Sequence, residues 1–199
     1  MFSVAFSLYA IKKNEVIKMR NKKVKFITQT AIFLALLIAL QFFSKPLGQL
    51  VTGSLVNFVM IAAVLLSGLA SGILVALLSP FFAFLLGIGP TFIQVVPIVA
   101  VGNLVLVLVY GLIFQYWKPK KAVSWCLSIV VGAGLKFLTL FYGVVGLALP
   151  FIPGINEKQS AALSSMFSWP QLLTAILGGI LALIVVPLIQ KARTGRTVS

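Results

Sequence analysis

The stretch Ala122–Leu149, AVSWCLSIVVGAGLKFLTLFYGVVGLAL, decides the fold of this chain. Its 28 residues include a single charged side chain, Lys136. A helix that crosses a membrane needs about 20 mainly apolar residues. The stretch is therefore long enough to cross a bilayer with some tilt, and it predicts a membrane-spanning helix.

Five further apolar segments accompany this stretch. Of the 199 residues, 61% are hydrophobic and 9% are charged, whereas soluble domains have roughly 25% charged residues. The mean hydropathy of +1.16 leaves too little polar surface to wrap a water-soluble globule. The sequence predicts an all-α membrane protein, a six-transmembrane-helix bundle with spans at 26–43, 55–69, 72–88, 92–116, 122–149 and 170–189. The segment 55–69 is the shortest of the six, and Gly68 and Gly72 favour a tight turn between it and the third span.

The positive charges give the bundle an orientation. Sixteen Lys and Arg residues against two acidic residues give a net charge of +14. Six crossings place thirteen of these cations on one side and leave Lys45 and Lys158 on the other. Because an excess of Lys and Arg marks the cytoplasmic side, both termini are predicted to be cytoplasmic (N-in/C-in). The thirteen are Lys12, Lys13, Lys18, Arg20, Lys22, Lys23, Lys25, Lys118, Lys120, Lys121, Lys191, Arg193 and Arg196. This distribution explains the charge without a nucleic-acid partner and lets the basic segments contact anionic lipid headgroups of the bilayer.

The same pattern divides the chain into three parts. Residues 1–24 are a predicted basic cytoplasmic tail, 25–190 the membrane domain, and 191–199 a second cytoplasmic tail. Met19 opens the sequence MRNKK and is a second candidate start, which would make 1–18 an upstream extension. The predicted outer loops are 44–54, 87–91 and 150–169, and the last contains a short helix that Asn156 is expected to cap.

The residues that are missing exclude several functions. The chain has no His and one cysteine, Cys126, which is expected only to pack. There is no acid inside any predicted span, no P-loop and no Ser-His-Asp set. A Cys/His metal site and a catalytic carboxylate pair are therefore not expected. We predict no cofactor, no metal site and no enzymatic activity in this chain.

Lys136 is the strongest candidate for a functional residue. It lies near the middle of its span, about 20 Å along the helix from the outer end. A charge at the bilayer centre costs at least about 2.5–3.5 kcal/mol, so Lys136 should face the bundle interior or a water-filled cavity. An anionic ligand could pair with it, and the alternative is a lysine that is satisfied by backbone carbonyls or that loses its proton when buried.

Other polar side chains are expected near Lys136 on neighbouring spans. Asn103 lies at a similar depth on the fourth span, which also carries Gln94, while Thr139 and Tyr142 follow Lys136 on the fifth. Together they predict two polar stripes, either for substrate or for interhelical hydrogen bonds. Trp169 begins the sixth span, as a ligand contact or as an interfacial aromatic.

Ala31, Ala35 and Ala39 repeat at a spacing of four along the first span. Small residues at this spacing let another helix approach closely. The partner helix is either in a second membrane protein or within the same bundle, and spacing alone leaves both open.

Several motifs resemble the S component of an energy-coupling factor (ECF) transporter, over roughly residues 22–191. A Lys-rich start precedes TAIFLAL at 30–36, in which Ala31 and Ala35 match the family's Ala-x-x-x-Ala signature. The segments TGSLVN at 52–57, LSPFFAFLLGIGP at 78–90 and FSWPQL at 167–172 are also similar to S-component sequences.

The resemblance implies a mechanism. S components are six-helix vitamin-capture subunits of the prokaryotic plasma membrane that bind a vitamin or related micronutrient from outside. They dock through their first helices on a membrane-embedded coupling subunit, which connects to two cytoplasmic ATPases. The family pocket lies in the outer half, so the resemblance implies contacts from Gln94, Asn103, Lys136, Tyr142 and residues near Trp169, with 44–54 as a lid.

Two further hypotheses remain beside the importer subunit. The first is a self-sufficient small carrier or channel that needs no ATPase partner. The second is a membrane scaffold that binds no small molecule, and it leaves Lys136 unexplained. Lys136 adds a finer prediction to the importer hypothesis: the substrate carries a carboxylate or phosphate, as pantothenate or a folate does.

Overall fold

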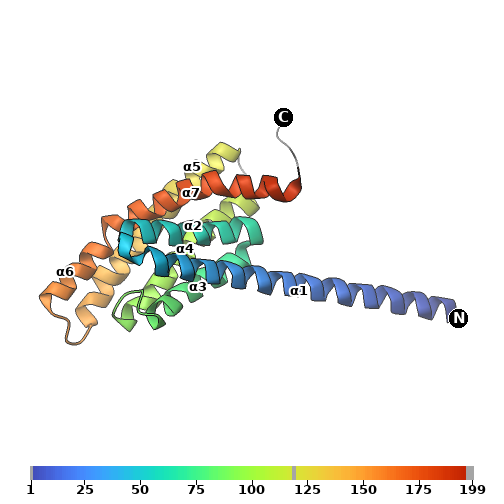
Figure 1. Cartoon of the computed structure of the whole chain (residues 1–199), viewed down its shortest axis with the longest axis horizontal. Coiled ribbons are helices and arrows are strands. Elements are labelled where there is room, and N and C mark those ends of the chain that lie inside the picture. The colour runs from blue at the N-terminus through green and yellow to red at the C-terminus, as the bar shows by residue number, and fades with distance from the viewer. Residues whose placement is uncertain (1, 118–119, 196–199) are drawn as a thin grey trace.

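The chain folds into a bundle of helices from which the first helix projects (Figure 1). The computed structural model describes the backbone of residues 2–117 and 120–195, and the side chains of 19–117, 120–193 and 195. Met1, Lys118 and Arg196, and the side chains of Lys12, Lys13 and Lys18, lie outside the described residues.

Every element of the described residues is helical. The α-helices are α1 (Phe2–Ser44), α2 (Gln49–Ser67), α3 (Leu69–Leu85), α4 (Val96–Gly111), α5 (Lys121–Leu140), α6 (Glu157–Met166) and α7 (Trp169–Thr194). Two π-helical segments, η3 (Leu112–Trp117) and η4 (Phe141–Ala148), continue α4 and α5. Three short 3-10 turns, η1 (Lys45–Leu47), η2 (Ile93–Val95) and η5 (Leu149–Phe151), complete the connections. The all-α fold is confirmed.

Five helical segments of the described chain are long and apolar enough to cross a membrane. They are Met19–Leu47, Gln49–Ser67, Ile93–Trp117, Lys121–Phe151 and Glu157–Arg193. The remaining apolar helix, α3, has 17 residues, or about 25 Å at 1.5 Å per residue, against a hydrocarbon core of about 30 Å. The structure therefore supports five spans directly.

The shortest segment is not the one that the sequence predicted. The second predicted span began at residue 55, but α2 begins six residues earlier, at Gln49, and has 19 residues. The predicted outer loop 44–54 is correspondingly wrong, because only η1 and Gly48 separate α1 from α2. Hydrogen bonds between Ser44 and Thr52 at 2.9–3.0 Å hold this tight connection together.

Other connections follow the predictions. Gly68, with a φ of 97°, ends α2 and starts α3, which is the tight turn that the sequence indicates. The turn at 87–91 separates α3 from η2. Asn156 caps α6 through a capping box with Gln159, at 2.8 Å and 3.2 Å.

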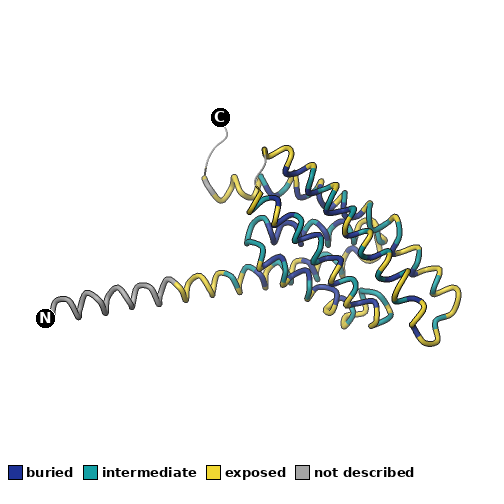
Figure 2. The backbone as a smooth tube through the Cα atoms, turned by 180° about the vertical axis from the view of Figure 1, so that it is seen from behind, coloured by how far each residue is buried: buried dark blue, intermediate teal, exposed yellow. Residues whose placement is uncertain are grey.

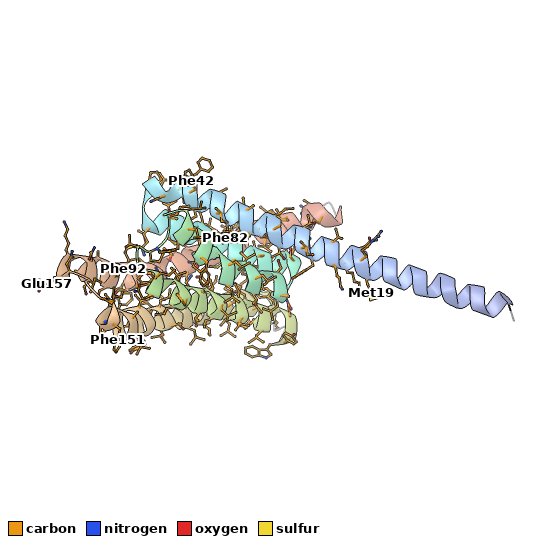
Figure 3. The ribbon with its side chains drawn as sticks, turned by 90° about the horizontal axis from the view of Figure 1, so that it is seen from below. Met19, Phe42, Phe82, Phe92, Phe151 and Glu157 are labelled. Atoms are coloured by element: carbon orange, nitrogen blue, oxygen red, sulfur yellow. The ribbon has the colours of Figure 1, made fainter. Side chains whose placement is uncertain are left out.

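Helix α1 differs from the predicted tail and span. It is continuous from Phe2 to Ser44, because no Gly or Pro interrupts the sequence before Pro46. Figure 3 shows Met19 on the part of α1 that projects from one end of the bundle and Glu157 at the opposite end. The C-terminal helix α7 likewise continues beyond the predicted boundary, to Thr194.

The core lies around α2. Its buried apolar residues pack on α3, α4 and α7, and Figure 2 shows the buried positions on the inward faces of these helices. A second cluster holds α6 against η4 through Leu163, Phe167 and Val144. Gly178 permits the close contact of α7 with α2, since a Cβ there would lie 2.6 Å from Asn57 Cβ.

Candidate functional site

A cavity of about 510 Å³ lies among the helices at the end of the bundle where α1 ends and α2 and α7 begin. Its volume falls within the range of about 300–1,000 Å³ that is usual for small-molecule sites. The lining residues come from α1–α7, η1 and the 87–91 turn: Gln41, Lys45, Gly48, Gln49, Thr52, Gly53, Val56, Asn57, Ser79, Pro80, Ala83, Gly87, Ile88, Gly89, Pro90, Thr91, Val99, Asn103, Lys136, Leu163, Met166, Phe167 and Gln171.

Three buried polar side chains meet in the lining of this cavity. Lys136 Nζ donates to Asn57 Oδ1 at 2.5 Å and to Asn103 Oδ1 at 2.7 Å. The exposed fractions are 3% for Lys136, 1% for Asn57 and 3% for Asn103. We call these three residues the lysine cluster.

Helix packing brings the lysine cluster together. Asn57 lies on α2, Asn103 on α4 and Lys136 on α5. Gly102 of α4 leaves room for Leu140 of α5, which allows these two helices to approach closely. The amide of Asn57 also lies 3.4 Å from Thr174 Oγ1 on α7, with its nitrogen as donor, so its oxygen is turned toward Lys136.

The lysine cluster contains no acid. Both hydrogen-bond acceptors of Lys136 are neutral amides, and no described carboxylate contacts its ammonium group. An ammonium group has three N–H donors, and the two amides use two of them. A buried charge needs a partner, so the cavity is suited to an anionic group. The described residues contain no group of three His, Cys, Asp or Glu that could hold a metal ion.

The walls of the cavity add polar groups that the sequence reasoning missed. The side-chain oxygen of Gln41 is buried and has no hydrogen-bond partner among the described residues. Ser79 and Thr52 also line the cavity. The sequence did contain a signal for two such residues: Gln41 and Asn57 are each a lone polar residue within an apolar run.

Hydrogen bonds join the elements at the end of the cavity where α2 and α7 begin. Lys45 Nζ donates to the carbonyl of Gly87 at 2.8 Å, which joins η1 to the 87–91 turn. Gln49 Nε2 and Gln171 Nε2 donate to the carbonyl of Met166 at 2.6 Å and 3.1 Å. The start of α2, the end of α6 and the start of α7 are thereby linked.

Of the predicted substrate contacts, Asn103 and Lys136 line the cavity and the other four do not. Gln94 is exposed on η2, and the Thr139 hydroxyl donates to the carbonyl of Leu135 at 2.8 Å. Tyr142 is 64% exposed. It lies six residues after Lys136, which is about 1.7 turns of an α-helix, and the chain there has changed to π-helix. It consequently points away from the face of Lys136.

Trp169 is exposed and stacks on Phe137, with ring centroids 5.9 Å apart. It does not line the cavity. This position fits the alternative interpretation of an aromatic residue at the membrane interface.

The alanine stripe lies on the outer face of α1. Ala31, Ala35 and Ala39 are all exposed, whereas Thr30 and Leu37 on the opposite face are buried. The Thr30 hydroxyl shares a hydrogen bond of 2.9 Å with Ser71 Oγ on α3. The stripe is therefore exposed and not buried against the other described helices.

Comparison with known proteins gives one match. The model of the family described as "ECF transporter, substrate-specific component" matches residues 25–190. No curated protein and no solved structure matches the chain. Because the family match covers most of the chain, this protein belongs to the family of substrate-specific components of ECF transporters.

Proposed function

We propose that this chain is the high-affinity capture subunit of an ECF-type importer for an anionic vitamin or related micronutrient. As a substrate-specific component it is a transport subunit rather than an enzyme. The observation that carries the proposal is the ammonium group of Lys136, which is buried in a cavity wall without a carboxylate partner.

The cavity is complementary to a small acid. A carboxylate or phosphate at Lys136 would form a charge-assisted hydrogen bond, which is about twice as strong as a neutral one. The buried oxygen of Gln41 calls for a hydrogen-bond donor, such as a hydroxyl or amide N–H. The bound molecule is therefore an anion at one end and a hydrogen-bond donor elsewhere.

The bundle crosses the plasma membrane of a prokaryote six times with both termini in the cytoplasm. Five long apolar segments support most of this count, and α3, a mainly apolar helix of 17 residues directly after α2, is the sixth crossing. Basic residues gather in the N-terminal half of α1 and at the end of α7. They favour a cytoplasmic location for the end of the bundle at which these two segments lie. The cavity then opens toward the outside, where a nutrient arrives.

The outer face of α1 docks on the coupling subunit. Association with an ECF module of a membrane component and ATPases follows from the family. Exposed Ala31, Ala35 and Ala39 give this face a flat surface on which a partner helix can pack. Two cytoplasmic ATPases then drive release of the substrate.

A self-sufficient carrier is the alternative, and reconstitution separates the two. Proteoliposomes with this chain alone and with the co-expressed ECF module are tested for uptake of radiolabelled acids, including pantothenate and folate. We expect ATP-dependent uptake of one acid only when the module is present. Uptake by the chain alone without ATP would favour the carrier and contradict the proposal.

A further inference from the structure

A second cavity, of about 310 Å³, lies at the opposite end of the helices that line the first. Its lining comes from the start of the apolar part of α1, the end of α2 and the end of α7: Lys22, Lys25, Phe26, Gln29, Leu66, Ser67 and Arg193. We call it the basal cavity. It shares no residue with the candidate substrate site.

Three cations surround the basal cavity. Lys22, Lys25 and Gln29 recur at intervals of three and four on α1 and so lie on one helix face. Arg193 approaches from α7. No carboxylate lies among the residues that line this cavity, so its positive charges have no internal counterion.

The donors around the basal cavity are only partly used. One guanidinium nitrogen of Arg193 donates to the carbonyl of Leu66 at 3.2 Å, where it caps the end of α2. An arginine has five N–H donors, so others remain available. The Ser67 hydroxyl is buried and has no hydrogen-bond partner among the described residues. Cationic and hydroxyl donors around one hollow are a chemistry that suits a phosphate group.

The position of the basal cavity selects a lipid as the source of that phosphate. Lys22 and Lys25 immediately precede the apolar part of α1, which begins at Phe26. They therefore lie where a spanning helix passes from hydrocarbon to headgroups. Basic pockets between membrane helices at this level bind the headgroups of anionic lipids. We propose that the basal cavity binds the phosphate of an anionic phospholipid.

The test compares lipid retention in matched variants of the full chain. Each protein is reconstituted in phosphatidylcholine vesicles containing phosphatidylglycerol, extracted into detergent, and analysed by native mass spectrometry for retained phosphatidylglycerol. The site variant combines Lys22→Gln, Lys25→Gln and Arg193→Gln. The control combines Arg20→Gln, Lys23→Gln and Lys121→Gln, which removes the same charge from exposed positions outside the cavity.

We expect the site variant to retain about tenfold less phosphatidylglycerol than the wild type and the control to stay within about twofold. Equal retention by the site variant, or an equal loss in the control, would overturn the proposal. A double variant, Lys22→Gln with Lys25→Gln, keeps the Arg193–Leu66 hydrogen bond. It guards against misfolding of the triple variant, and it should lose most of the retained lipid with an unchanged thermal midpoint.

Two further measurements exclude other anions. The wild-type protein is treated with inorganic phosphate and, separately, with sodium chloride of the same ionic strength. If phosphate displaces the retained lipid and sodium chloride does not, the site binds free phosphate and the lipid proposal is wrong. If the site variant keeps its lipid but no longer co-purifies with the ECF module, the cavity instead receives an acidic protein segment. Retained lipid that is lost only with the site substitutions supports the proposal.

Discussion

The ammonium group of Lys136 on α5 donates a hydrogen bond to the amide oxygen of Asn103 on α4 at 2.7 Å. A second hydrogen bond, to the amide oxygen of Asn57 on α2, holds the same ammonium group from another side. The two bonds together fix the lysine in the cavity wall. Neither acceptor neutralises the charge. The lysine is therefore held in place without an acidic partner, which is the arrangement that the proposed pairing with a small acid uses.

The first prediction concerns the coupling between these two residues. Asn103→Leu should lower the free energy of unfolding by about 1–3 kcal/mol, because it leaves a buried donor without its acceptor. In a Lys136→Met background the same substitution should cost clearly less, since no charge is left to satisfy. A double-mutant cycle on the detergent-solubilised protein measures this difference. Additivity within about 0.5 kcal/mol would mean that the hydrogen bond does not matter energetically.

The second prediction concerns the contact between α2 and α7. Gly178→Ala should destabilise the protein by about 1–3 kcal/mol and weaken ligand binding. The added Cβ would lie 2.6 Å from Asn57 Cβ and 2.8 Å from the carbonyl oxygen of Ser54, so the lysine cluster must shift. Gly134→Ala is the matched control, because nothing lies within 4 Å of its added Cβ. Thermal midpoints that fall equally for both variants would contradict the packing argument.

The third prediction concerns the alanine stripe. Ala35→Trp should abolish co-purification with the ECF module and uptake by cells, and should leave ligand binding by the isolated chain unchanged. The bulky ring would keep a partner helix away from the exposed face of α1. Val130→Trp on α5 is the control, since Val130 is 70% exposed and lies on another helix. Normal uptake by the Ala35→Trp variant would remove the docking role.

The fourth prediction concerns the orientation of the chain. The single cysteine makes a Cys126→Ala background cysteine-free, and new cysteines then report their side of the membrane. A membrane-impermeant maleimide on intact cells should label Lys158→Cys, and should label Asn21→Cys and Gly195→Cys only after permeabilisation. Labelling of Asn21→Cys and Gly195→Cys on opposite sides would show an odd number of crossings and exclude the six-span arrangement.

Hydropathy and turn residues were enough to predict the helical bundle, the turn at Gly68 and the capped helix α6. These features depend on local sequence. The burial of Lys136 and Asn103 could be predicted as well, because a charge and an amide in mid-span must turn away from lipid.

Features that depend on tertiary contacts were not predictable. Asn57 lies inside the predicted second span, and it was missed because its contacts with Lys136 on α5 and Thr174 on α7 depend on how α2 packs against those helices. Tyr142 was placed near Lys136 although six residues are about 1.7 turns of an α-helix, and the change to π-helix after Leu140 alters its direction further. The contribution of Gln41 to the cavity depends on how α1 packs, which its own sequence does not specify.

The central claim is that Lys136 pairs with an anionic substrate, and the direct measurement is the set of small molecules that the purified chain retains. Wild-type, Lys136→Met and Lys158→Met proteins are purified gently from the same cells, denatured, and their extracts compared by mass spectrometry. Lys158 is the control because it is exposed on α6 and does not line the cavity. Loss of one charge-assisted hydrogen bond should reduce retention about 10- to 100-fold.

We therefore expect one acid, a carboxylate or a phosphate, to be enriched in the wild-type and Lys158→Met extracts and nearly absent from the Lys136→Met extract. Retention of the same compound by all three proteins, or enrichment of a compound without an anionic group, would contradict the claim.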